Sequence, residues 1–173
     1  GLAYNVFDGV VPDGPGQAGV TVRRAAEEMR ALGRLEQKSK LMPRYSELMA
    51  LAADTGRFGG VVVSNYVNIL DIAKPEQFSA VVFSFGKNDH FIAFRGTDDN
   101  LAGWKEDFLM SFKSVVPAQS QAVTYINAVV PRLRGRVHLG GHSKGGNLAV
   151  FAAVHTSESI RRRIKTVYNN DGP

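Results

Sequence analysis

The chain contains no cysteine among its 173 residues. This absence excludes disulfide bridges, a thiolate nucleophile and metal sites with cysteine ligands, although it does not identify a compartment. No apolar run reaches the roughly 18 residues that a membrane span needs, and no charged start followed by an apolar core marks a signal peptide. We therefore expect no membrane span, no metal and no cofactor, and we take the cytoplasm as the default location.

The composition is that of one globular α/β domain, with 44% hydrophobic and 21% charged residues. The chain begins at Gly1 rather than at a methionine, and it ends at Gly172-Pro173 directly after an apparent strand. We interpret residues 1–173 as a single domain, and as a fragment that lacks its N-terminal start and its C-terminal strands.

Positive charge exceeds negative charge, with a formal net charge of +5. The basic residues are spread along the chain, and the tight groups are Arg161 to Arg163 and the alternating Arg132, Arg134 and Arg136. Groups this short are typical of solvated faces, and they lack the interleaved aromatic residues of a nucleic-acid surface. We expect no nucleic-acid partner.

Hydrophobic periodicity changes from helical to strand-like along the chain. Thr21 is suited to cap a helix over 22–32, and a turn at 86–89 separates two apolar segments as in an antiparallel hairpin. Later segments alternate strand and helix, which implies parallel crossovers. We predict an α/β-hydrolase-type fold: a mostly parallel sheet flanked by helices, with an antiparallel start. The further predicted elements are helices near 44–53, 104, 117–130 and 147–154 and strands over 61–67, 80–85, 91–94, 136–139 and 164–169.

The strongest motif is G-x-S-x-G, which Gly141 to Gly145 match between the predicted strand and helix. In this context the motif is typical of a nucleophile elbow, where a strained Ser143 projects outward and the backbone amide of Lys144 supplies half of an oxyanion hole. We expect the Lys144 ammonium to be solvated. The alternative is an ordinary tight crossover with a bystander serine, and the spacing fits neither dinucleotide nor P-loop phosphate cradles.

A second motif, Phe94-Arg95-Gly96-Thr97 followed by Trp104 and Asp107, resembles the F-R-G-S/T region of the class 3 lipases. This resemblance implies that Thr97 supplies the second oxyanion donor and that Asp107 is a structural partner. The stretch from Phe94 to Pro173 is also similar to a bacterial lipase-like family of uncharacterised function, which bears F-R-G-T-D, W-K-E-D-F, V-P-A-Q, G-G-H-S-K-G-G-N-L-A and N-x-D-G-P-G. That likeness implies a fold and a reaction type and names no substrate.

A serine nucleophile needs a histidine base held by a carboxylate, in the chain order serine, acid, histidine. None of the four histidines fits this order comfortably, and His142 is interpreted as a pocket residue because it adjoins the nucleophile. Asp171 follows the strand after the elbow and is either the triad acid or a turn residue. We expect the base to lie beyond Pro173.

Two functions remain open at this point. The first is an esterase, lipase or other acyl hydrolase, acting on a small-molecule or lipid ester through an acyl-Ser143 intermediate. The second is a catalytically incomplete binding module that keeps the hydrolase fold.

Overall fold

The computed structural model describes residues 2–35, 44–71, 76–96 and 115–173. Six strands form one sheet in sequential order, β1 to β6. The pairs from β1 to β4 are antiparallel, whereas β4–β5 and β5–β6 are parallel. The predicted α/β sheet with an antiparallel start is confirmed. The strands are β1 (Val20–Thr21), β2 (Val62–Asp71), β3 (Glu76–Ser84), β4 (Asp89–Phe94), β5 (Arg136–His142) and β6 (Ile164–Asn170).

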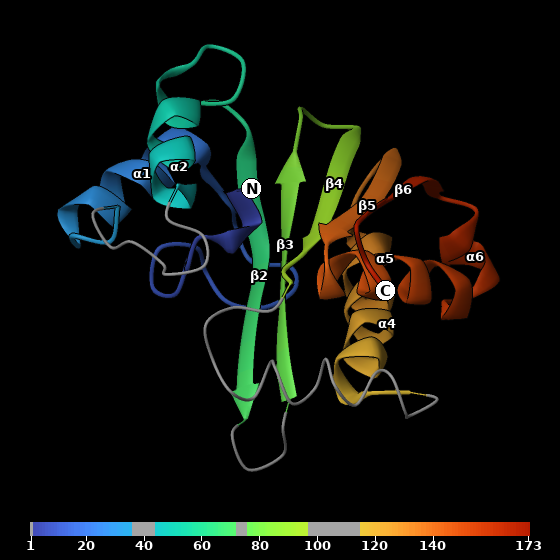
Figure 1. The fold of residues 1–173 in the computed structure, drawn as a ribbon. Helices are drawn as coiled ribbons and strands as arrows, with labels where there is room; N and C mark the ends of the chain where they lie inside the picture. The colour runs from blue at the N-terminus through green and yellow to red at the C-terminus, as the bar shows by residue number, and fades with distance from the viewer. Residues whose placement is uncertain (1, 36–43, 72–75, 97–114) are drawn as a thin grey trace.

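Helices cover both faces of the sheet (Figure 1). One side carries α1 (Val22–Ala31) and α2 (Tyr45–Asp54), and the other carries α4 (Pro117–Val129), α5 (Lys144–His155) and α6 (Glu158–Arg161). Two short 3₁₀ turns complete the described elements, η1 (Leu2–Tyr4) and η2 (Val130–Arg132). Within the described ranges, no helix is both long enough and apolar enough to cross a membrane.

The sheet separates two hydrophobic cores, because successive side chains of a strand point to opposite faces. On β4, Ile92 and Phe94 join the core beneath α4 and α5. Phe91 and Ala93 face the other core, which α1, α2 and the N-terminal segment cover. Each face of β4 is therefore assigned to one layer of helices.

Helix α1 begins directly after Thr21, the predicted N-cap. The Thr21 hydroxyl accepts a hydrogen bond from the Arg24 amide at 3.2 Å, which satisfies one of the donors left open at a helix start. The buried side chains recur at helical spacing, and the chain turns away at Gly33, whose φ is 67°. Helix α2 buries Ser46 and Met49, whereas Leu48 is 43% exposed.

Strand β2 is longer than the predicted 61–67 and contains a bulge between Ser64 and Val67. Asn65 lies at the bulge with φ 52°, and its side-chain oxygen accepts a bond from the Gly16 amide at 2.8 Å. The Tyr125 hydroxyl donates to the Asn65 carbonyl at 2.6 Å. These partners, which lie far from Asn65 in the sequence, satisfy its polar groups at the bulge.

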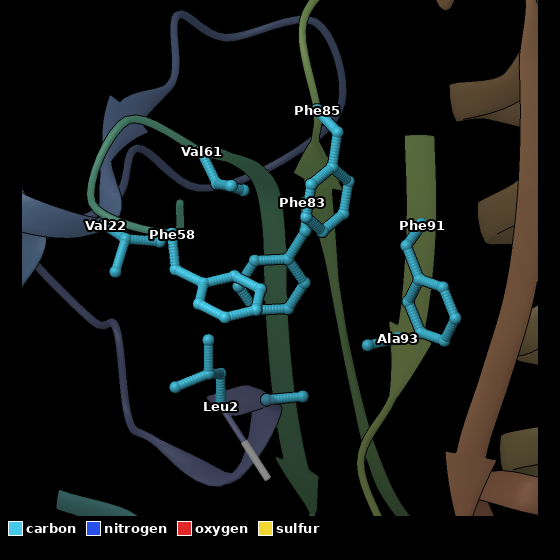
Figure 2. A pocket seen from close by; sticks show the side chains of 9 residues that line it. Leu2, Val22, Phe58, Val61, Phe83, Phe85, Phe91 and Ala93 are labelled. Atoms are coloured by element: carbon cyan, nitrogen blue, oxygen red, sulfur yellow. The ribbon is translucent and has the colours of Figure 1, made fainter. Parts of the chain in front are cut away.

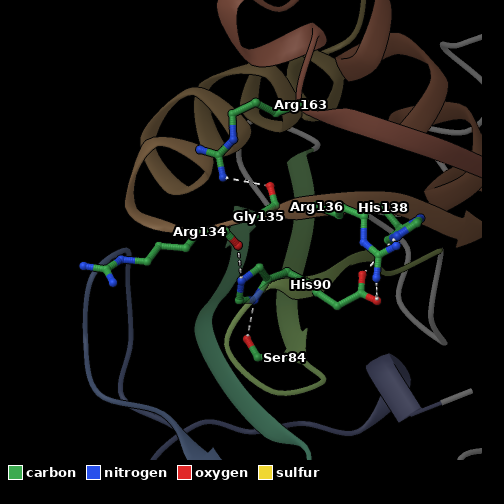
Figure 3. A network of polar contacts seen from close by, with 8 residues as sticks. Ser84, His90, Arg134, Gly135, Arg136, His138 and Arg163 are labelled. Atoms are coloured by element: carbon green, nitrogen blue, oxygen red, sulfur yellow. Dashed lines mark hydrogen bonds and ion pairs between the residues drawn. The ribbon is translucent and has the colours of Figure 1, made fainter.

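The arginine group at 161–163 is only partly solvated. Arg161 and Arg162 are exposed, but Arg163 is half-buried and donates to the carbonyls of Val130 and Leu133, each at 2.5 Å. A weaker contact reaches the Gly135 carbonyl at 3.3 Å (Figure 3). Arg163 thus provides hydrogen-bond donors to carbonyls of η2 and its C-cap, and the prediction of a solvated face is wrong for this residue.

Candidate functional site

Ser143 lies at a sharp corner between β5 and α5. Its φ of 54° and ψ of −130° fall outside the regions that non-glycine residues favour. The Ser143 amide donates to the Asn170 carbonyl on β6 at 2.9 Å, and the Ser143 carbonyl accepts from the Gly146 amide at 2.8 Å. The corner is held from both sides, so the strained conformation persists.

The glycines of the motif allow the backbones of β5, α5 and the end of β4 to approach one another closely. An added Cβ at Gly141 would lie 2.2 Å from the carbonyl carbon of Gly145. One at Gly145 would lie 2.3 Å from the carbonyl oxygen of Phe94, at the end of β4. Backbone atoms cannot give way by such amounts, and therefore the corner requires glycine at both positions.

Lys144 is the first residue of α5, so its amide belongs to the open donors at the helix start. Its side chain is 1% exposed, and Nζ donates to the Gln77 carbonyl on β3 at 2.9 Å. The expectation of a solvated ammonium is therefore wrong. The lysine instead ties the first turn of α5 to the neighbouring strand, a contact between residues 67 positions apart that local sequence patterns do not reveal.

The end of β4 packs against the same corner. An added Cβ at Gly96 would lie 2.6 Å from the His142 carbonyl oxygen and 2.4 Å from the Tyr4 hydroxyl. Thr97, Trp104 and Asp107 lie outside the described residues. The described chain thus brings the residue before Thr97 into contact with the residue before Ser143.

His142 faces the N-terminal turn. Its Nδ1 lies 3.2 Å from the Tyr4 hydroxyl, at hydrogen-bonding distance, and the Tyr4 ring stacks on Tyr45 with centroids 4.5 Å apart. Burial raises the pKa of the Tyr45 hydroxyl. An aromatic pair from η1 and α2 therefore stands beside the corner, which the sequence alone did not indicate.

The other three histidines are placed away from Ser143. His90 Nε2 lies 2.8 Å from the Arg134 carbonyl, and its Nδ1 lies 2.8 Å from the Ser84 hydroxyl (Figure 3). His138 Nε2 lies 3.1 Å from Asp89, at the amino end of the parallel strands. His155 ends α5, with its ring centroid 4.1 Å from that of Phe151.

All four histidines are among the described residues, and none is hydrogen-bonded to the Ser143 hydroxyl there. The described residues also hold no group of three histidine, cysteine or acidic side chains arranged for a metal ion. The local arrangement thus consists of a serine, backbone amides and an aromatic wall.

Asp171 follows β6 at the same edge of the sheet. Its φ is 57°, and its side chain is exposed. The next residue packs tightly, because an added Cβ at Gly172 would lie 2.8 Å from the Ser143 carbonyl oxygen. The Gly172 amide also donates to the Asn169 side chain at 2.9 Å. The turn that carries Asp171 is therefore seated against the corner, while its role as an acid remains a prediction.

Two polar motif residues have structural roles that the sequence did not reveal. Gln119, at the start of α4, accepts from the Val116 amide at 3.0 Å and donates to the Asn147 side chain on α5 at 2.9 Å. Asn147 in turn donates to the Pro173 carbonyl at 2.9 Å. These bonds join α4, α5 and the turn after β6, and so they fix the helix that begins at the Ser143 corner.

A family model described as Mbeg1-like matches residues 52–173, a stretch that runs from the last turn of α2 to the end of the chain. It contains Ser143, Lys144 and Asp171, whereas η1, β1 and α1 precede it. The comparisons with curated proteins and with solved structures each gave no match.

Proposed function

The chain belongs to the Mbeg1-like family, a lipase-like domain family, and from this premise we propose that it is a serine hydrolase that cleaves an ester through an acyl-Ser143 intermediate. The observation that carries the proposal is the conformation of Ser143. A serine with φ 54° between a strand and a helix, with glycines packed on both sides, is the arrangement that exposes a nucleophile.

The chemistry follows from the placement of the backbone. The Ser143 oxygen attacks the ester carbonyl and gives its proton to a base, and the tetrahedral intermediate carries a negative charge. Lys144 is the first residue of α5, and this position supports the assignment of its amide as one donor to that charge. We assign the second donor to the amide of Thr97, which directly follows the Gly96 packed against the elbow.

The remaining steps release the alcohol and then the acid. The leaving alcohol takes a proton, and water hydrolyses the acyl-Ser143 ester to return the serine. Each well-placed oxyanion donor contributes about 3 kcal/mol to the transition state. Asp171 is the candidate acid of this site, because its turn packs on the Ser143 backbone.

A fluorophosphonate probe on the folded, full-length protein tests the proposal. We expect covalent labelling of wild type and of Ser120→Ala, since Ser120 is an exposed serine on α4. Ser143→Ala should not be labelled. Absence of labelling in folded wild-type protein, or equal labelling of Ser143→Ala, contradicts the assignment.

One observation favours a second function, a binding module that retains the fold without catalysis. Each of the four histidines has another neighbour: His90 contacts Ser84, His138 contacts Asp89, His142 contacts Tyr4, and His155 contacts Phe151. Hydrolysis of p-nitrophenyl butyrate separates the two functions. Turnover that disappears in Ser143→Ala supports the hydrolase, whereas no turnover together with unlabelled Ser143 supports the binding module.

A further inference from the structure

A hydrophobic pocket lies on the α1–α2 side of the sheet (Figure 2). It has a volume of about 160 Å³, and its lining side chains are all apolar. They come from η1, the start of α1, the segment before β2, strand β3 with the residue that follows it, and strand β4: Leu2, Ala3, Val22, Phe58, Val61, Phe83, Phe85, Phe91 and Ala93. A cavity of this size and lining holds an apolar group of about six carbons.

A second apolar pocket adjoins the first. It has a volume of about 360 Å³ and is lined by α2 residues together with Leu2, Thr55 and Phe58. Leu2 and Phe58 line both pockets, so these two side chains form the partition between them. Rotation of either side chain would extend the first pocket toward α2.

The first pocket is close to the elbow. Ala93 pairs with Gly140 across the parallel β4–β5 ladder, and His142 follows Gly140 by two residues on the same face of the sheet. Strand geometry therefore puts His142 about 8 Å from the pocket wall at Ala93. The sheet surface between the pocket and His142 is formed by Ala93 and Gly140, and neither residue has a side chain large enough to obstruct it.

The N-terminal turn connects the two places directly. Leu2 and Ala3 line the pocket, while Tyr4, the last residue of the same 3₁₀ turn, contacts His142 and Gly96. One element thus forms both the pocket wall and the aromatic wall of the elbow. This element precedes the family match, which begins at residue 52.

We propose that this pocket binds the acyl chain of the ester that Ser143 attacks, and that it limits the chain to about twelve carbons, because about six span the distance from the elbow and about six fill the pocket. The inference rests on the proposed hydrolase function and adds the substrate class. The lining supports a hydrocarbon chain, because it offers no polar side chain to satisfy a sugar, peptide or phosphate group. The carbonyl end of the chain remains at the elbow, next to the amides.

Chain-length dependence is the first test. With p-nitrophenyl acetate, butyrate, octanoate, laurate and palmitate, we expect kcat/KM to rise by up to about fourfold per methylene that enters the pocket, until the pocket is full. It should then level off or fall beyond laurate. A flat series, or one that rises evenly to palmitate, overturns the inference.

Filling the pocket is the second test. Ala3→Phe puts a ring into the cavity from the partly exposed turn, and it should lower kcat/KM for laurate at least tenfold while acetate changes less than threefold. Ala31→Phe, at an exposed position ending α1, is the matched control and should keep the wild-type series. Equal losses for all esters in Ala3→Phe contradict the proposal.

Enlarging the pocket gives an independent variant. Phe85 is 48% exposed, so Phe85→Ala opens the pocket with little risk to folding. The preferred chain should lengthen by several carbons. An unchanged preference in folded Phe85→Ala counts against the acyl site.

Binding without turnover separates this inference from the proposed function. Calorimetry on Ser143→Ala with octanoate should show binding that acetate does not show and that Ala3→Phe weakens at least tenfold. If octanoate binds while Ser143 of wild type resists the fluorophosphonate, the hydrolase proposal fails and the apolar site remains. If Ser143 is labelled but octanoate does not bind, the acyl site fails alone.

Discussion

Ser143, the proposed nucleophile, has a strained backbone. Its conformation is imposed by neighbours: the Asn170 carbonyl holds its amide, and the turn at Gly172 packs on its carbonyl. A non-glycine residue in such a region costs on the order of 1–3 kcal/mol. The fold pays this cost at the one serine that the proposed chemistry needs, which is the pattern expected of a functional residue.

The strain predicts an unusual order of stability among variants. Ser143→Gly should be more stable than Ser143→Ala by about 1 kcal/mol, because glycine relieves the backbone strain. The greater conformational entropy of glycine in the unfolded chain offsets only part of this gain. Equilibrium urea unfolding measures the difference.

An exposed helical serine provides the control. At Ser120, on α4, the order should reverse, with Ser120→Ala more stable than Ser120→Gly by about 1 kcal/mol. If alanine is the more stable choice at both positions, the backbone at Ser143 is not strained.

At the scale of elements, the site depends on how α5 is seated. Its first turn is fixed to β3 by Lys144, its second by the Gln119–Asn147 bond to α4, and its glycines admit the end of β4. The helix start is thus bound to three neighbours before any substrate is present. In the proposed reaction, amides preorganised in this way would stabilise charge without reorganisation.

Removing the lysine contact should affect both stability and turnover. Lys144→Met keeps most of the buried side-chain volume but leaves the Gln77 carbonyl without the ammonium donor. We expect a loss of about 2–3 kcal/mol in unfolding free energy and a lower kcat with little change in KM, since the α5 amides lose their fixed position.

The matched control is Lys165→Met, because Lys165 is an exposed lysine on β6. It should leave unfolding and both kinetic constants unchanged. Lys144→Met with wild-type kcat would show that the side chain supports folding alone.

Local signals predicted most elements. The Thr21 cap, the turn at Gly86 and the strand–glycine–helix order around Ser143 each act over a few residues, and the structure confirms the elements that they predicted. The burial of Lys144 and the last residues of β2 were not predicted, because they depend on partners far away in the sequence: Lys144 contacts Gln77, and Asn68 contacts Asp8. The same is true of Tyr4, whose contact with His142 spans 138 residues.

At the scale of the whole molecule, helices cover both faces of one sheet, and the core on each face contains a buried tyrosine. Tyr125 of α4 packs on Phe78 and Phe94, with its hydroxyl on the Asn65 carbonyl. Tyr66 of β2 lies in the other core, and its hydroxyl donates to Asp8 at 3.0 Å. Both sides of the sheet therefore depend on a protonated phenol.

Alkaline pH should loosen both layers. Burial raises the pKa of Tyr125, and burial together with the Asp8 carboxylate raises the pKa of Tyr66 despite the opposing Arg95. A phenol with a raised pKa binds its proton more tightly in the folded state. Its contribution is complete below the unfolded pKa of about 10 and is lost as pH rises above that value, by up to about 1.4 kcal/mol per pH unit for each tyrosine.

Tyr125→Phe separates this effect from other alkaline changes. At neutral pH the variant should lose about 1–2 kcal/mol, because the Asn65 carbonyl loses its donor. Above about pH 10, unfolding free energy should fall less steeply with pH than in wild type, by up to about 1.4 kcal/mol per unit, since one linked proton is gone. Urea unfolding from pH 7 to pH 11.5 measures both quantities, with the exposed Thr124→Ala as the control on the same helix. Equal slopes in Tyr125→Phe and wild type would mean that this phenol ionises as readily in the folded chain as in the unfolded one. The hydrogen bond from Tyr125 to the Asn65 carbonyl would then be accessible to solvent.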